Sequence, residues 1–435
     1  MSDLNVGILG IVVMLVLMAL RMPVGIAMGL VGFVGIGIIG GWDAALLRLA
    51  STPYEHSYSY QLSVLPLFLL MGNFATVSGL SRDAYLAANA WIGHWRGGLA
   101  SATILACSGF AAVSGSSVAS AATMGAVTLP EMQKYGYDKK MATGAVAAGG
   151  TLGILIPPSN GFILYALLTE ESVGRLFMAG VIPGIILTAL FVLTIIVLTR
   201  FNPKLGPAAP KRDMPERWRA LGGASYLIVI ILMTFGGIYS GVFTPTEAAS
   251  IGALLTMLVA LARRRLTFAI LVENLIDTAR TTSFIFLILI GAFFFGPFLA
   301  LSDIPQQLSH LIESVAAPRI WILLAILVFY LLLGTFMEEF AMIVLTLPII
   351  FPLIVALGYD PIWFGVVIVL VIEMALISPP VGMNVFVVKA IAGDVTMNDV
   401  FTGIMPFWGA LIVCLAIVVA FPDIALLLPN AMYGK

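Results

Sequence analysis

Charged residues are scarce in this 435-residue sequence, in which Asp, Glu, Lys and Arg together make up 10% and hydrophobic residues 61%. A soluble domain of this size needs far more charge on its surface. The strands of a membrane barrel would alternate polar and apolar residues, whereas here long apolar runs such as Ile182–Leu198 recur along the whole chain. With a mean hydropathy of +1.09, the composition predicts an all-α polytopic membrane protein.

Cysteine and histidine are also rare, which restricts the chemistry that the chain can carry. Cys107 and Cys414 lie far apart in apolar segments, and His56, His94 and His310 do not cluster with them. A disulfide framework and a His/Cys metal site are therefore not expected. No histidine is placed to activate a serine in the sequence SGSSVAS, so an intramembrane hydrolase is disfavoured. We expect no enzyme activity and no organic cofactor.

The sequence repeats itself at a shift of 222 residues, at which chance would give about 0.6 coincident prolines. Instead four proline pairs coincide at the expected places within corresponding spans, and the GYD motif at 136–138 coincides with GYD at 358–360. We infer an internal duplication in which both halves fold alike. These pairs are Pro23 with Pro245, Pro130 with Pro352, Pro157 with Pro379, and Pro158 with Pro380.

Apolar spans occur in the same order in both halves. Each half should contain three helices, an amphipathic piece, two short arms, a segment broken by prolines and a final helix. In the first half these are expected at 4–20, 23–41, 61–80, 82–96, 98–113 with 119–132, 140–168 and 174–199. In the second half they are expected at 221–240, 246–262, 274–300, 303–317, 319–334 with 340–356, 361–391 and 399–421. A polar, proline-rich linker at 200–220 should join the halves on the cytoplasmic side.

The paired arms are too short to cross a bilayer, since about 16 residues reach roughly 24 Å of a roughly 30 Å hydrocarbon core. We interpret 98–132 and 319–356 as re-entrant hairpins; two ordinary spans with a short turn are the alternative. Five crossings per half place the second half upside down relative to the first. With the N-terminus outside, 17 of the 21 basic residues fall inside, as the positive-inside rule requires. The start MSDLNVGILG should begin a span and not a cleaved signal peptide.

The proline pairs interrupt segments that should otherwise be continuous helices. A proline has no N–H and clashes with the carbonyl four residues back, and it moves the preceding residue out of the helix. Such breaks are tolerated in a membrane only where protein or water covers them. Because polar residues flank both, we predict an ion and substrate site; two mechanical kinks are the alternative. The carbonyls expected to be freed are those of Gly153 and Ile154, and of Ala375 and Leu376.

Carbonyl and hydroxyl oxygens suit Na⁺, and the N-terminal ends of the half-helices after each break suit an anion. No Lys or Arg is expected at midplane depth, so helix ends, Ser and Asn groups, and co-bound cations would hold an anionic substrate. The predicted substrate-binding residues are Ser116, Ser117, Ser159, Asn160, Gly382 and Asn384.

Three acidic residues, Glu338, Glu339 and Glu373, lie near these segments. Acids inside a membrane indicate function by default, so proton coupling through them is one interpretation. The other is that Glu338 caps the second arm of its hairpin and that Glu373 accepts hydrogen bonds from neighbouring helices. Glu247, in TPTEAAS, should serve only the first turn of a helix that begins at Pro245.

Four motifs resemble the large, DctM-like membrane subunit of tripartite ATP-independent periplasmic (TRAP) transporters. They are GSSVASAATMG and GILIPPSNGFILYA in the first half, and GTFMEEFAMIVLTLPIIFPLI and ISPPVGMNVFVV in the second. The resemblance covers essentially the whole chain. It implies an elevator-type, Na⁺-driven secondary transporter of the ion-transporter superfamily that imports an organic acid, such as a C4-dicarboxylate or a sugar acid.

The resemblance also implies partners: a soluble periplasmic substrate-binding protein and a small four-helix membrane subunit, expected here as a separate chain. It implies the bacterial inner membrane, with a periplasmic N-terminus, and no nucleic acid. The scaffold is expected at 1–97 and 221–318, and the transport part at 98–199 and 319–435. A channel, or a stand-alone or proton-coupled anion carrier, is the alternative. Matched motif by motif, the family's Na⁺ ligands fall on Ser116, Ser117, Gly153, Ile156, Pro158, Gly334, Ala375 and Ser378.

Overall fold

The computed structural model describes residues 2–58, 60–307 and 318–434, and these form helices and connecting turns without a strand. Eight helical segments of this part are long and apolar enough to cross a membrane. The first half contains α1 (Asp3–Ala19), α2 (Val24–Gly40), α3 (Trp42–Ser57), η1 (Tyr60–Ser63), α4 (Val64–Ser78), α5 (Leu80–Ile92), α6 (Gly98–Ser114), α7 (Ser117–Lys134), α8 (Lys139–Leu155), α9 (Asn160–Thr169) and α10 (Val173–Phe201).

The second half begins after the short helix η2 (Pro203–Leu205). It repeats the order of the first half. Its elements are α11 (Met214–Tyr239), α12 (Pro245–Ala262), α13 (Phe268–Leu301), α15 (Arg319–Gly334), α16 (Glu339–Ala356), α17 (Pro361–Leu376), α18 (Met383–Ala392), α19 (Met397–Ala420) and α20 (Asp423–Tyr433).

The duplication predicted from the sequence is confirmed by the packing. A shift of 222 residues places both ends of α7 on the ends of α16. Contacts between the halves come in exchanged pairs: α2 packs on α13 and α4 on α12, while α7 packs on α18 and α9 on α16. Under the shift, α2 corresponds to α12 and α4 to α13, so the contact of α2 with α13 is equivalent to that of α4 with α12. In the same way α7 corresponds to α16 and α9 to α18, so the contact of α7 with α18 is equivalent to that of α9 with α16. This is the relation expected of two repeats about a two-fold axis.

The repeated GYD motif forms the same helix start in both halves. Gly136 and Gly358 have positive φ angles of 71° and 75°, which glycine adopts without strain. Two residues later, Asp138 accepts backbone N–H groups at the start of α8, and Asp360 accepts the N–H of Trp363 at the start of α17. The two helices that lead into the proline breaks are therefore positioned alike.

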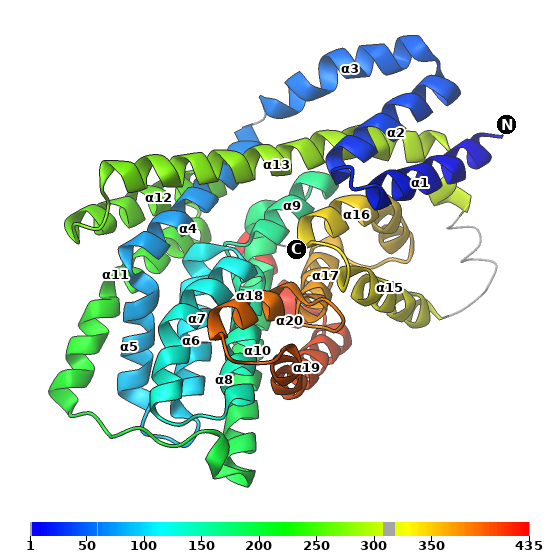
Figure 1. Cartoon of the computed structure of the whole chain (residues 1–435). Coiled ribbons are helices and arrows are strands. Elements are labelled where there is room, and N and C mark those ends of the chain that lie inside the picture. Colours follow the sequence, from blue (N-terminus) through cyan, green and yellow to red (C-terminus); the bar gives the residue numbers. More distant parts are fainter. Residues whose placement is uncertain (1, 59, 308–317, 435) are drawn as a thin grey trace.

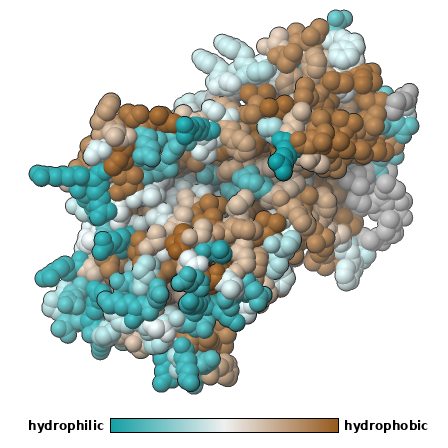
Figure 2. Space-filling model, in the orientation of Figure 1, coloured by the Kyte–Doolittle hydropathy of each residue, from teal (hydrophilic) through white to brown (hydrophobic). Residues whose placement is uncertain are grey.

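The long helix α13 crosses the molecule from beside α4 to α1 and α2, and contacts α16 on the way (Figure 1). Helices α6, α7, α8 and α10 lie together below it in this view, on the same side as the segment that joins α10 to α11. Figure 2 shows hydrophilic residues gathered at this lower end and hydrophobic residues over the opposite end. The polar end therefore coincides with the linker.

Several predicted boundaries are wrong. The linker predicted at 200–220 covers only 202–213, because α10 continues to Phe201 and α11 begins at Met214. Arg217, at the polar start of α11, donates to the nearby carbonyl of Arg212 and lies over the ring of Trp91, which is distant in the sequence. The helix predicted at 274–300 begins already at Phe268.

Two helices were not predicted. Helix α3 carries Asp43, Arg48, Glu55 and Pro53, so its hydropathy is low. Under the 222-residue shift it corresponds mostly to the first turns of α13. Helix α20 follows α19 after a short turn. The amphipathic piece predicted at 303–317 lies largely outside the described residues, as does His310, while 304–307 are helical.

Candidate functional site

The first proline break packs against the tip of the first hairpin, which lies between α6 and α7. Ile156 leaves the helical conformation with ψ at 118°, as predicted, and the helix resumes at Asn160. The hydroxyl of Ser159 caps α9 by accepting the N–H of Phe162. The Asn160 N–H donates to the Gly115 carbonyl at 3.3 Å. The break and the hairpin tip are thus joined through their backbones.

Two glycines allow this close approach. An added Cβ on Gly115 would lie 2.9 Å from the carbonyl oxygen of Pro158, and one on Gly153 would lie 2.5 Å from that of Ser116. No hydrogen bond to the carbonyl of Gly153 or Ile154 is found in the described part of the chain, as the proline argument predicts. The predicted Na⁺ ligands Ser116, Gly153 and Pro158 therefore come together at one place.

The second break and the second tip, between α15 and α16, are also in contact. An added Cβ on Gly334 would lie 2.6 Å from the Cβ of Ala375, so these two predicted ligands adjoin. The Ala375 carbonyl, predicted to be free, instead accepts the N–H of Ser378 at 3.0 Å. That prediction is wrong, because the last turn tightens and pairs the carbonyl with a residue three positions on.

The Ser378 hydroxyl is held from two sides. It donates to the Met374 carbonyl at 2.6 Å and accepts the indole N–H of Trp408 in α19 at 2.9 Å. Sequence reasoning missed Trp408. The available signal was that an indole N–H in an apolar span requires an acceptor.

The hairpin tips begin their second arms with equivalent caps. Ser116 accepts the N–H of Ala119 at 3.3 Å, and Glu338, at the equivalent position of the second repeat, accepts the N–H groups of Phe340 and Ala341 at 3.1 and 3.2 Å. The predicted capping role of Glu338 is confirmed. So is that of Glu247, whose carboxylate and Thr244 form a capping box at the start of α12.

Each hairpin tip and the proline break that it contacts form a tip–break pair. A hydrogen bond between the repeats joins the two pairs. The Asn384 amide, just after the second break, donates to the Ser117 hydroxyl of the first tip at 2.6 Å. Both side chains are buried. The side-chain oxygens of Asn384 and Asn160 have no hydrogen-bond partner within the described residues. Gly382 has a φ of 60° and starts α18 in the left-handed region.

The acidic residues of the second repeat occupy positions that carry hydroxyls in the first. Glu339 corresponds to Ser117 and Glu373 to Thr151 under the 222-residue shift. Glu373 is fully buried beside Thr151 and Leu155 of α8. The Thr151 hydroxyl, however, donates to the Ala148 carbonyl, and neither carboxylate oxygen of Glu373 has hydrogen-bond geometry to a described residue.

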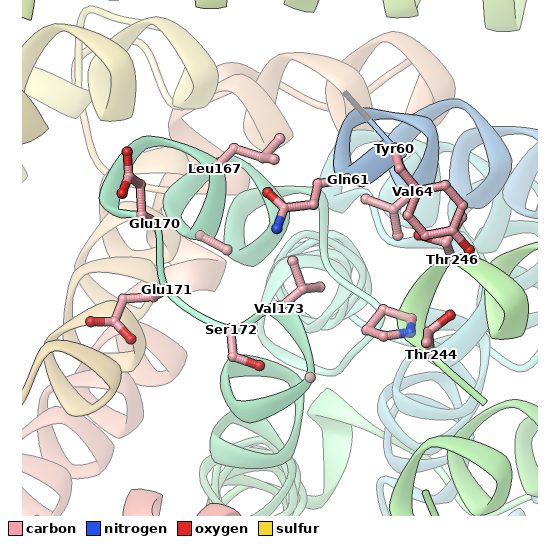
Figure 3. A pocket seen from close by; sticks show the side chains of 13 residues that line it. Tyr60, Gln61, Val64, Leu167, Glu170, Glu171, Ser172, Val173, Thr244 and Thr246 are labelled. Carbon is pink, nitrogen blue, oxygen red and sulfur yellow. The ribbon is translucent and has the colours of Figure 1, made fainter. Parts of the chain in front are cut away.

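A cavity of about 470 Å³ lies away from both breaks, where η1 and the starts of α4 and α12 face the turn between α9 and α10. Figure 3 shows Gln61 directed into this space. Glu170 and Glu171 belong to the turn itself, and their side chains are directed away from Gln61. Burial raises the pKa of Glu171, as does the nearby Asp360, while Arg175 opposes them. The cavity contains none of the predicted site residues.

Comparisons with known proteins agree over most of the chain. Residues 11–424 match the family described as "Tripartite ATP-independent periplasmic transporter, DctM component". The chain is 39% identical to the C4-dicarboxylate TRAP transporter large permease protein DctM of Pseudomonas aeruginosa, covering 88% of this chain and 89% of that protein.

It is 31% identical to the isethionate TRAP transporter permease protein DctMQ of Oleidesulfovibrio alaskensis, with 92% of this chain and 63% of that longer protein covered. Among solved structures, the YdaH transporter of Alcanivorax borkumensis superposes with a TM-score of 0.62 at 14% identity, over 89% of this chain and 90% of the other. The last likeness concerns the fold alone.

Proposed function

The chain belongs to the family of DctM components of tripartite ATP-independent periplasmic transporters, and we propose that it is the large permease subunit of a Na⁺-coupled importer of an organic acid. The observation that carries this proposal is the meeting of both tip–break pairs at the Asn384–Ser117 hydrogen bond. Polar, irregular backbone from four segments converges there inside an otherwise apolar protein. Such backbone is tolerated in a membrane only where protein buries it or where it lines a water-filled cavity, and a binding site between these segments would provide both.

The first proposed Na⁺ site consists of the tip residues Ser116 and Ser117 with the carbonyls of Gly153, Ile156 and Pro158. Close packing of Gly153 on Ser116 supports it, as does the Gly153 carbonyl, which no described residue pairs by a hydrogen bond. Broken helices in secondary transporters supply backbone carbonyls to Na⁺ in this manner.

The second proposed Na⁺ site consists of Gly334, Ala375 and Ser378. The contact between Gly334 and Ala375 supports it. Because the Ala375 carbonyl already accepts one hydrogen bond, only its second lone pair is available to an ion. The Ser378 hydroxyl can likewise offer one remaining lone pair.

The organic acid is proposed to bind between these ions, at Ser116, Ser117, Ser159, Asn160, Gly382 and Asn384. Helices α9 and α18 begin at the two breaks, and their N-terminal ends favour an anion. The co-bound Na⁺ ions would add positive charge. The names of the two relatives indicate anionic cargo in both cases, a dicarboxylate and a sulfonate.

Transport is proposed to follow an elevator mechanism in which 98–199 and 319–435 move against a scaffold of 1–97 and 221–318. Both tips and both breaks belong to the former set, so the site would travel as one body. Cysteine pairs that join α4 to α6, which are in contact here, test this motion. Full uptake by the cross-linked protein would exclude it.

The proposed partners are a periplasmic substrate-binding protein and a small membrane subunit on a separate chain. The match covers 63% of the DctMQ relative, which fits an additional segment in that protein. The proposed orientation places the N-terminus in the periplasm and the linker in the bacterial cytoplasm, because 17 of the 21 basic residues then lie inside.

Coupling to protons is the second candidate, and one observation favours it. Glu373 is buried with both carboxylate oxygens unpartnered among the described residues, and Glu339 is buried with one. A buried unpaired carboxylate is costly unless a proton or a cation neutralises it.

Reconstituted uptake separates the two candidates. The chain is placed in proteoliposomes with its small subunit and binding protein, and uptake is measured with a Na⁺ gradient or a pH gradient alone. Saturable uptake that requires the Na⁺ gradient supports the proposal. Uptake driven by the pH gradient without Na⁺ favours the carboxylates, and no saturation would indicate a channel.

A further inference from the structure

An apolar groove opens beside the first break, between α11 on one side and α6, α10 and the break on the other. Its volume of about 390 Å³ is in the range of pockets that hold one ligand. Ile156 and Pro157 line it from the break, Ile185 from α10, and Phe235, Gly236 and Tyr239 from α11.

The surroundings of this groove indicate hydrocarbon as its occupant. Both α10 and α11 are long and apolar enough to span a membrane. The groove is continuous with their exposed apolar surface, where Ile185 is 62% and Leu232 65% exposed. None of its lining residues is charged. A bound water would find too few hydrogen-bond partners to remain there.

One end of the groove has a polar marker. Tyr239 is the last residue of α11 and is half exposed, so its phenol lies where the helix ends. Tyrosine is favoured at the boundary between hydrocarbon and head groups, because its ring is apolar and its hydroxyl is polar. The groove therefore runs from a head-group level at Tyr239 toward the first break.

We propose that this groove binds one acyl chain of a membrane phospholipid, with the head-group end at Tyr239. The chain contacts the side chains of Ile156 and Pro157, whose backbone belongs to the break. It fills the gap that the protein leaves on the side that faces the membrane. Because an acyl chain offers no hydrogen-bonding group, it packs on these side chains alone, while the backbone of the break stays within the protein, where Pro157, Pro158 and Ser159 are buried.

Gly236 provides a specific test, because an added Cβ there meets no heavy atom within 4 Å. In Gly236→Trp or the smaller Gly236→Leu, the new side chain can occupy the groove. Gly222 is the matched control. It lies about four turns earlier on α11 on a similar face, its Cβ also meets nothing within 4 Å, and it does not line the groove.

The chain is reconstituted with its small subunit in vesicles that contain phosphatidylethanolamine with a diazirine in the middle of one acyl chain. After illumination, labelled peptides are mapped by mass spectrometry. We expect label on α11 around 231–239 and on α10 around 178–185. It should fall at least about fivefold in Gly236→Trp and remain in Gly222→Trp. Equal labelling of both variants, or stronger labelling by a head-group diazirine than by the acyl probe, overturns the proposal.

A second measurement rests on the proposed function and is kept separate from the first. The two walls of the groove belong to the proposed scaffold and transport parts, so a fixed side chain between them should lower maximal uptake several-fold in Gly236→Trp but not in Gly222→Trp. Labelling needs no transport. If Gly236→Trp loses the label but keeps normal uptake, the acyl-chain site is supported and the elevator mechanism is contradicted. If Gly236→Trp keeps the label, the acyl-chain site is refuted.

Discussion

Gly153→Ala should damage the first Na⁺ site while leaving the helix intact. The new methyl carbon would start 2.5 Å from the Ser116 carbonyl oxygen and 2.9 Å from the Ser120 hydroxyl, whereas ordinary contact begins at 3.4 Å. The hairpin tip and α8 must therefore separate by roughly 0.9 Å along the first direction. The obstacle is backbone, which cannot rotate away as a flexible side chain can.

The magnitude follows from two opposing effects. Overpacking a close contact costs about 1–3 kcal/mol, and replacing a helical glycine by alanine returns about 0.5–1 kcal/mol. The net cost is about 0–2.5 kcal/mol with a middle value of about 1.2 kcal/mol, which corresponds to a roughly eightfold higher Na⁺ concentration for half-maximal uptake if the ion site bears it.

The assay is the Na⁺ dependence of uptake in proteoliposomes, together with the thermal stability of the purified protein at increasing Na⁺. Gly409→Ala in α19 is the control, because its Cβ meets nothing within 4 Å and the same helix propensity is gained. We expect Gly409→Ala to resemble the parent. A stable Gly153→Ala protein with the parent's Na⁺ dependence would show that the contact between tip and break is not part of an ion site.

Three further predictions concern other parts of the chain. Replacing Pro379 and Pro380, or Pro157 and Pro158, by Ala should let the helix close, raising helicity while uptake falls steeply; unchanged Na⁺ dependence in well-folded variants would make the breaks purely architectural. Trp408→Phe removes the indole donor to the Ser378 hydroxyl, so Na⁺ affinity should fall up to about tenfold. The affinity is measured from the thermal stabilisation of the protein by Na⁺, and a normal affinity would contradict a second Na⁺ site at Ser378. The Asp399 carboxylate accepts the hydroxyl of Thr396 at 2.7 Å and lies 3.6 Å from the ammonium of Lys140; the charged form that makes both interactions is lost on protonation in acid. Asp399→Asn should thus lower the melting temperature near neutral pH and not in acid, and a pH-independent difference would refute this.

The sequence by itself determined the spans, the duplication and the two breaks. Each depends on local properties: the length of an apolar run, the missing N–H of Pro157–Pro158 and Pro379–Pro380, and the cap that a GYD motif provides. These effects act within a few residues, so no knowledge of distant contacts is needed. Among the described residues the Gly153 carbonyl has no hydrogen-bond donor, for this local reason.

Contacts between distant residues were decided only by the tertiary structure. Asn384 and Ser117 are 267 residues apart and meet because the repeats pack about a shared axis. Trp408 holds Ser378 from another helix, and the Ala375 carbonyl is paired because the final turn of α17 tightens. Helix α3, too polar for a hydropathy reading, packs on α2 and α13. In each case the deciding free energy comes from burying polar groups or apolar surface against a partner that local sequence does not specify.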